Sequence, residues 1–140
     1  MSAPAPLSPG GLPVIEVSWG ELIDKITILE IKEQRLTSPQ AVANVRKELA
    51  VLDRAFAALA PAPAELAGLK RELKAINETL WDIENSTRAK EAAQTFDQEF
   101  VQLTRSVYLN NDKRAAIKRR INDLLNSGLV EEKQYTSYKT

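Results

Sequence analysis

The fold of this chain is constrained most by two apolar stripes that flank the segment Pro61-Ala62-Pro63. In each stripe, apolar residues recur at alternating steps of three and four positions, the spacing that keeps one side of a helix facing a partner. The first stripe contains Val42, Val45, Leu49, Leu52, Phe56 and Leu59, and the second contains Leu66, Leu69, Leu73, Ile76, Leu80 and Ile83. The two stripes therefore predict two helices that pack together as a long antiparallel hairpin.

The first helix is predicted to run from Trp19 to Leu36. It opens on Ser18-Trp19-Gly20-Glu21, which has the S-x-x-E form of a capping box. Its apolar residues fall on two sides, with Leu22, Ile26, Leu29 and Leu36 on one side and Ile28 and Ile31 on another. Because a helix that is apolar on two sides is usually central, we expect other helices to cover both sides.

Two helices are predicted to follow it. Thr37-Ser38-Pro39 supplies a cap and a first-turn proline for the second helix, which is expected to end before Pro61. The third helix is expected to begin near Ala64. Its stripe fades at Asn85-Ser86-Thr87, and the sequence leaves open whether the helix continues there with a phase shift or breaks briefly.

The last helix carries a further heptad stripe. The stripe is formed by Phe96, Phe100, Leu103 and Val107, and Ile117, Ile121 and Leu124 resume it in the same register. Between these groups stands Asn110-Asn111-Asp112. In one interpretation the helix passes through this segment, unbroken or kinked; in the other the segment is a turn, with Asp112 as the N-cap of a new helix. The agreement in phase favours the unbroken helix, which places Asn110 and Arg114 on the stripe. Gly128 is expected to end the helix in the left-handed conformation.

These patterns together predict an all-α protein, an antiparallel helical bundle of four to five helices built on a long helical hairpin. Residues 14–128 are expected to form a single domain. Residues 1–13 are rich in Pro, Ala, Ser and Gly and are expected to be a disordered leader, and residues 129–140 a polar C-terminal tail. The segment from Val14 to Val17 can be extended, but a lone strand cannot form a sheet.

Composition limits the chemistry of the chain. Its 140 residues, 44% of them hydrophobic, are enough to bury the core of one domain. Nineteen basic residues balance nineteen acidic ones, so no global field attracts nucleic acid or an anionic membrane. The sequence has no cysteine and no histidine, which excludes disulfides, thiolate and imidazole chemistry and ordinary zinc sites, and we expect no cofactor. No apolar stretch approaches the roughly 20 residues that span a bilayer, so we expect a soluble, cytoplasmic protein without membrane insertion.

The most basic stretch runs from Lys113 to Arg120. Its cations are Lys113, Arg114, Lys118, Arg119 and Arg120. Such a run can bind the phosphates of nucleic acid, a nucleotide sugar or a lipid. The alternative is an exposed, solvated helix face with Arg114 in an internal ion pair. The run contains no interleaved aromatic residue for stacking on bases, so nucleic acid is not the expected partner.

Charged residues also stand among the apolar residues of the first helix: Asp24, Lys25, Glu30 and Glu33. Glu33 falls on the stripe that ends at Leu36, so we expect it to be a buried carboxylate paired with Arg105 or Arg114 of a neighbouring helix. Buried pairs of this kind fix the register of helices more often than they perform catalysis.

Two carboxylates of the third helix, Glu78 and Asp82, lie four positions apart and so on one face. With carboxylates from another helix they could hold Mg²⁺. Dimetal sites in helical bundles normally also use a histidine three positions from a glutamate, and this chain has none. No metal site is therefore predicted. Trp81, beside the core stripe, is expected to be a packing residue.

Most of the chain after the leader carries motifs dense in polar residues. They are Ser18–Lys32, Asn77–Glu84, Phe96-Asp97, Arg105–Tyr108, Asn111–Ala115, Ile117–Arg119, Ile121-Asn122 and Val130–Lys133. These motifs resemble those of a bacterial family of small helical proteins catalogued as a domain of unknown function. The resemblance implies no activity, but it implies an association with genes for surface-sugar assembly, including glycosyltransferases. The family tends to have an acidic residue after Ile83-Glu84, where this chain has Asn85.

Several residues of these motifs are polar, although packing of a helical core does not require polar residues at their positions. They are Asp24, Lys25, Asn77, Arg105, Tyr108, Asn111, Asp112 and Arg114. If the first helix packs between the hairpin and the last helix, these residues converge in one polar cluster. Our hypothesis is that the cluster is either a buried network that specifies the fold or a recognition site for a partner or an anionic ligand.

From the sequence we expect a non-catalytic interaction or accessory module of a bacterial protein assembly, linked to surface polysaccharide. It would bind a protein partner, associate with itself through a leftover apolar stripe, or do both. The alternative is a binder of phosphate ligands or nucleic acid that uses the basic run from Lys113 to Arg120. A third interpretation is a magnesium-dependent enzyme that uses carboxylates.

Overall fold

The computed structural model describes residues 3–139; residues 1 and 2 of the expected leader and residue 140 of the expected tail lie outside this part. Its four helices are α1 (Trp19–Arg35), α2 (Pro39–Ala57), α3 (Ala64–Ala92) and α4 (Gln98–Leu124). The described residues contain no β-strand, and one isolated β-bridge joins Leu7 to Pro13. The predicted all-α bundle is confirmed. None of the helices within residues 3–139 has the length and apolar character needed to cross a membrane.

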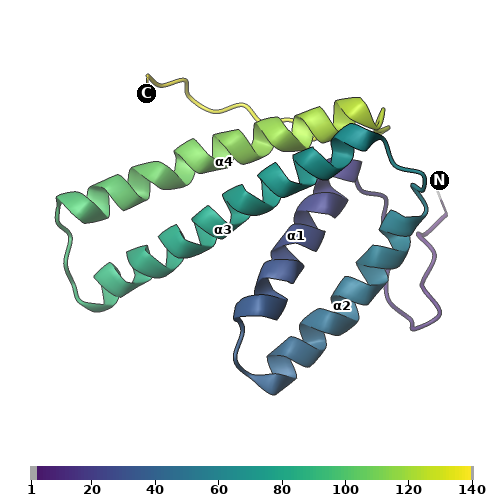
Figure 1. The fold of residues 1–140 in the computed structure, drawn as a ribbon, viewed down its shortest axis with the longest axis horizontal. Coiled ribbons are helices and arrows are strands. Elements are labelled where there is room, and N and C mark those ends of the chain that lie inside the picture. Colours follow the sequence, from purple (N-terminus) through teal and green to yellow (C-terminus); the bar gives the residue numbers. More distant parts are fainter. Residues whose placement is uncertain (1–2, 140) are drawn as a thin grey trace.

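The helices form two hairpins, a short one of α1 and α2 and a long one of α3 and α4 (Figure 1). A long helical hairpin is therefore present, but the predicted pairing of α2 with α3 is wrong. The stripe of α2 packs on α1, and only side chains at the end of α2, such as Phe56, reach the core around α3. Helical spacing shows that a face is apolar, but two stripes with the same spacing do not show which helix each one meets.

The central position of α1 is confirmed. Leu22, Ile26 and Leu29 of α1 pack with Val45 and Leu49 of α2 in one hydrophobic cluster. On the other side, Ile23 of α1 joins a second cluster whose remaining buried members come from α3 and α4: Leu66, Leu69, Leu73, Ile117 and Ile121. Helix α1 therefore connects the two hairpins.

Both segments for which the sequence left a break open are helical. Helix α3 continues through 85–87, and α4 through 110–112. The Thr87 hydroxyl donates to the carbonyl of Ile83 at 2.7 Å, and the Asn110 amide donates to the carbonyl of Ser106 at 2.8 Å. Because these polar side chains bond one turn back along their own helix, they do not interrupt it.

The end of α4 corrects a detail of the prediction. The residue with positive φ is Asn126, at 50°, and not Gly128. The Ser127 amide donates to the carbonyl of Asn122 at 2.8 Å, and the Asn126 amide donates to that of Asp123 at 3.3 Å, which is the Schellman pattern. The chain then turns back, and the tail runs along α4 (Figure 1).

Candidate functional site

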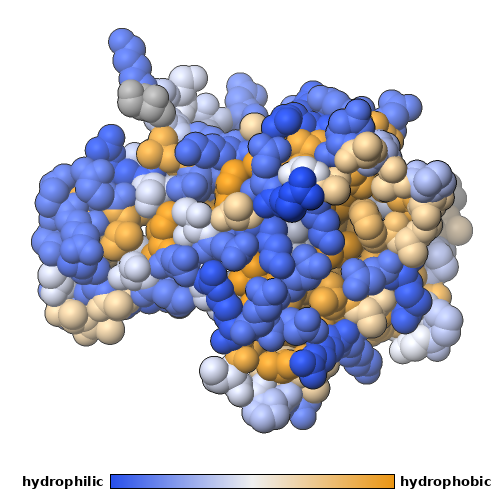
Figure 2. All heavy atoms as spheres, viewed as in Figure 1, coloured by the Kyte–Doolittle hydropathy of each residue, from blue (hydrophilic) through white to orange (hydrophobic). Residues whose placement is uncertain are grey.

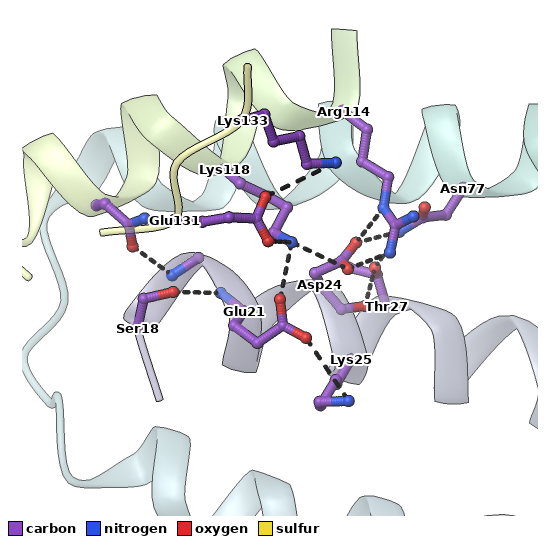
Figure 3. Close-up of polar contacts among 12 residues, drawn as sticks. Ser18, Glu21, Asp24, Lys25, Thr27, Asn77, Arg114, Lys118, Glu131 and Lys133 are labelled. Carbon is purple, nitrogen blue, oxygen red and sulfur yellow. Dashed lines mark hydrogen bonds and ion pairs between the residues drawn. The ribbon is translucent and has the colours of Figure 1, made fainter. Parts of the chain in front are cut away.

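A buried polar network lies where α1, α3 and α4 meet (Figure 3). Its centre is Asp24, whose side chain is 1% exposed. Arg114 of α4 donates to both carboxylate oxygens of Asp24, with Nε 2.9 Å from Oδ1. Asn77 of α3 donates from Nδ2 to Asp24 Oδ1 and to Thr27 Oγ1, at 2.9 Å each. One carboxylate thus connects three helices.

Lys118 is a second buried charge, on the next turn of α4, and its side chain is 6% exposed. Its Nζ lies 2.8 Å from a carboxylate oxygen of Glu21 and 3.7 Å from Asp24 Oδ2. It also lies 3.1 Å from a carboxylate oxygen of Glu131, which attaches the tail to the network (Figure 3). Because Glu21 binds Lys118, its carboxylate does not complete the predicted capping box, although Ser18 Oγ accepts from the Glu21 amide at 3.1 Å.

The hydrogen bonds keep these groups charged. Burial alone would raise the pKa of Asp24, but the hydrogen bonds from Arg114 and Asn77 lower that pKa below its ordinary value. Burial alone would lower the pKa of Lys118, but the hydrogen bonds to Glu21 and Glu131 raise it. The described residues contain no buried side-chain nitrogen or oxygen without a hydrogen-bond partner. The network is therefore ionised, and all of its buried side-chain nitrogens and oxygens are paired.

The start of α1 docks closely against the end of α4. The Gly20 amide donates to Asn122 Oδ1 at 2.7 Å, and the Trp19 amide donates to Ser127 Oγ at 3.3 Å. A Cβ at position 20 would lie 2.7 Å from the backbone oxygen of Lys118, so glycine is needed for this approach.

The predicted polar cluster divides into a buried part and an exposed part. Asp24, Asn77 and Arg114 belong to the buried network. Lys25 is on the surface, 52% exposed, and pairs with Glu21 at 3.6 Å. Arg105 is exposed and takes no part in the network.

The other three members of the predicted cluster lie on α4 beside the tail. Asp112 accepts a hydrogen bond from the hydroxyl of Tyr138, and the ring of Tyr138 packs edge-on against that of Tyr108. The half-buried Asn111 lines a cavity on each side of Arg114. This part of the cluster is therefore accessible at the surface.

The predicted burial of Glu33 is wrong. Its side chain is 37% exposed and pairs with Arg46 of α2 at 3.3 Å, not with Arg105 or Arg114. The physical reason is that α2, and not α4, covers this side of α1. Glu30 instead connects α1 to α3, with its carboxylate oxygens 3.5 Å from the Lys70 amine and 3.9 Å from the Lys74 amine.

The basic run is not one cationic surface. Arg114 forms the predicted internal ion pair, and Lys118 is buried beside it. Arg119 lies 3.1 Å from Glu132, and Arg120 lies 3.5 Å from Glu72 on α3. Lys113 is exposed. Carboxylates thus neutralise most of the run.

Glu78 and Asp82 both lie against Arg35, at 3.7 and 2.7 Å. The guanidinium of Arg35 balances the negative charge of these two carboxylates, which a divalent cation would need for binding. Among residues 3–139, no group of three or more Asp, Glu, His or Cys side chains is arranged to hold a metal ion.

Sequence reasoning missed three parts of the network: the burial of Lys118, and the roles of Asn122 and Glu131. A signal for the first two was present, because steps of four from Arg114 lead to Lys118 and then to Asn122 on one face of α4. The role of Glu131 depends on the turn after α4, which no local spacing encodes.

Two of the cavities that border the network are lined by Arg114. One, of about 390 Å³, lies at the junction of the two hairpins; among its lining residues are Ile28, Leu80, Trp81, Val107 and Arg114. The other, of about 770 Å³, lies between α4 and the tail; Tyr108, Arg114 and Tyr135 help to line it. Arg114 therefore lies between a cavity lined by both apolar and polar side chains and one rich in tyrosine.

The fold and the site define a small helical protein in which an internal network of charges joins two hairpins and is bordered by cavities open to the surface. The family model described as "Family of unknown function (DUF6165)" matches residues 14–140, and the chain belongs to this family. The match begins where the expected leader ends. Neither a curated protein nor a solved structure gives a significant match.

Proposed function

We propose that this protein is a non-catalytic interaction module that binds a partner protein in the junction cavity, as an accessory to a larger bacterial assembly. The surface-sugar association implied by the resemblance suggests polysaccharide synthesis as the process. The observation that carries the proposal is the partly exposed apolar lining where the two hairpins diverge.

The charged groups favour binding over catalysis. A catalytic acid or base works best with a pKa near the working pH. Here the pKa of Asp24 is lowered and the pKa values of Lys118 and Arg114 are raised, all away from neutrality. Groups held in this way fix the positions of helices and do not exchange protons near neutral pH.

The junction cavity exists because α1 diverges from the long hairpin (Figure 1). Ile28 and Ile31 of α1 line it together with Leu80, Trp81 and Val107 of the long hairpin. In Figure 2 the outline is indented between the two arms, and hydrophobic patches stand between polar residues near their junction.

An amphipathic helix of a partner fits this geometry. It would lie between α1 and the long hairpin and would bury its apolar side on Trp81 and its neighbours. The rim carries charges of both signs, Glu84 and Arg88, which are 2.8 Å apart and can pair with the polar side of such a helix. The phosphate alternative is not favoured, because most cations of the basic run are already paired with carboxylates.

The proposal is tested by affinity capture from a lysate of the source organism with matched variants. Trp81→Glu places a charge in the cavity. Thr79→Glu places the same charge on an exposed position of α3 that lies on the opposite side of the helix. We expect a specific protein to be captured by the wild-type chain and by Thr79→Glu, and to be lost with Trp81→Glu.

Circular dichroism establishes that both variants are folded. Capture that is equal for the two variants, or that yields no specific protein, would overturn the proposal. If the protein captured through the cavity is a second copy of this chain, sedimentation shows a concentration-dependent dimer that Trp81→Glu abolishes, and the partner assigned here is replaced by self-association.

A further inference from the structure

The tail lies on α4 as a peptide lies on a binding surface. Two adjacent carboxylates of the tail meet two adjacent cations of α4: Glu131 lies 3.1 Å from Lys118, and Glu132 lies 3.1 Å from Arg119. Figure 3 shows the first of these contacts, with Glu131 reaching from the tail to Lys118. The α4 surface therefore recognises a pair of acidic residues.

A second contact holds the other end of the tail. The Tyr138 hydroxyl donates to Asp112, and its ring packs edge-on against Tyr108 with the ring centroids 5.1 Å apart. Within the described part of the tail, 129–139, the backbone forms no hydrogen bond to another backbone group. The tail is held mainly by side chains at its two ends, so it can leave without breaking secondary structure.

The tail fills its surface incompletely. Between the two contacts, the cavity of about 770 Å³ remains, and a volume of this size accommodates large side chains. Arg114 uses Nε and Nη2 on Asp24, while Nη1 donates no hydrogen bond among the described residues. Because no buried nitrogen there lacks a partner, Nη1 is accessible to solvent. Arg114, with this free donor, and Tyr108 line the α4 side of the cavity, whereas Tyr135 and Tyr138 belong to the tail and would leave with it.

We propose that the α4 surface beneath the tail is a docking groove for an extended segment of a partner protein. The segment carries two adjacent carboxylates followed, several residues later, by a large aromatic side chain, and the protein's own tail occupies the groove in its absence. The inference deepens the proposed function and rests on it, but it concerns a separate cavity.

The tail also sets a threshold for the partner. A tethered segment competes at an effective concentration of the order of millimolar. A free segment that makes only the same contacts is therefore bound weakly, whereas one that also fills the cavity beside Tyr108 gains additional buried apolar surface. Because the tail competes, only a partner segment that makes more contacts with the groove than the tail makes is expected to bind.

The test uses the full chain and a fluorescent peptide with the sequence of residues 129–139. In the variant Glu131→Gln/Glu132→Gln, the tail is weakened as a competitor while every α4 residue of the groove is unchanged. We expect fluorescence anisotropy to show the peptide binding this variant more tightly than wild type, by about threefold or more. Binding should weaken as salt is added, because ion pairs carry it.

A control peptide with glutamine at both glutamate positions should bind neither chain. If the double variant is unstable, Tyr138→Phe serves instead, since it removes only the hydroxyl that reaches Asp112. Equal affinity of the two peptides, or no binding to any chain at millimolar peptide, would overturn the inference. None of these variants changes Trp81. The docking groove can therefore be disproved while the proposed function is supported, and the capture experiment with Trp81→Glu can fail while the docking groove is supported.

Discussion

The two sides of α1 hold the two hairpins together by different means. Toward α2 the buried contact is apolar, formed by Leu22, Ile26 and Leu29 against the stripe of α2. The ion pair of Glu33 with Arg46 on this side is exposed. Toward α3 and α4 the apolar contact of Ile23 is joined by Asp24 and its hydrogen-bond partners. Apolar contact is non-directional and tolerates repacking, whereas a buried ion pair is stable only in one geometry. We infer that the polar side fixes the register of the bundle.

The difference between the two sides of α1 is tested most strongly by replacing one residue on each side with a residue of similar shape. We expect Asp24→Asn to lower the free energy of unfolding by about 3–5 kcal/mol, because Arg114 loses its ionised partner inside the protein. Leu29→Met, a change of similar size on the apolar side, should cost less than about 1.5 kcal/mol. Urea unfolding measures both. Equal losses would show that the two sides are held in the same way.

Among the buried contacts of α1, only those on the polar side should respond to acid and alkali. The pKa of Asp24 is lowered below its ordinary value of 3.8, so its stabilisation is present above pH 3.8 and is lost as the pH falls through its pKa in the folded protein. The pKa of Lys118 is raised above 10.5, so its contribution is complete below pH 10.5 and is lost as the pH rises through the folded value.

We therefore expect urea unfolding to give a plateau of stability between about pH 5 and pH 9 and a decline on each side of it. In Asp24→Asn the acid decline should be shallower. An acid limb with the same slope in the variant and the wild type would show that other carboxylates cause the decline.

A smaller effect is expected where α1 approaches α4. In Gly20→Ala the new methyl group would lie 2.7 Å from the Lys118 carbonyl oxygen, so the helices must separate slightly. Overpacking of this kind costs about 1–3 kcal/mol. Gly68→Ala in α3 is the control, because its nearest neighbour is the end of the Arg71 side chain at 3.8 Å. A thermal melt in which both variants behave alike would contradict a tight contact at Gly20.

Much of the fold could be predicted from the sequence, because helix caps and apolar spacing are local signals. Ser18 and Ser38 cap their helices as predicted, and α1 is central because it is apolar on two sides. The pairing of α2 could not be predicted in this way. Its stripe and that of α3 have the same spacing, and only the packing around α1 decides which surfaces meet.

The candidate site was predictable to a similar degree. Asp24, Asn77 and Arg114 stood out because a helical core does not require polar residues at these positions. Lys118 did not, since a lysine within a run of cations is typical of an exposed helix face. Its burial depends on Glu131, which the turn at Asn126 brings back from the tail. A contact created by chain reversal has no local signature.

The most direct test of the central claim compares two arginines of α4. Arg114→Ala leaves Asp24 with only part of its compensation, and we predict that urea unfolding will show a loss of about 3–5 kcal/mol. Arg105→Ala, an exposed change on the same helix, should stay within about 0.5 kcal/mol of wild type. If the two variants are equally stable, the network around Asp24 does not hold the hairpins together. If Arg114→Ala is destabilised as predicted, the buried network helps to hold α1 on the long hairpin, beside the apolar contact of Ile23.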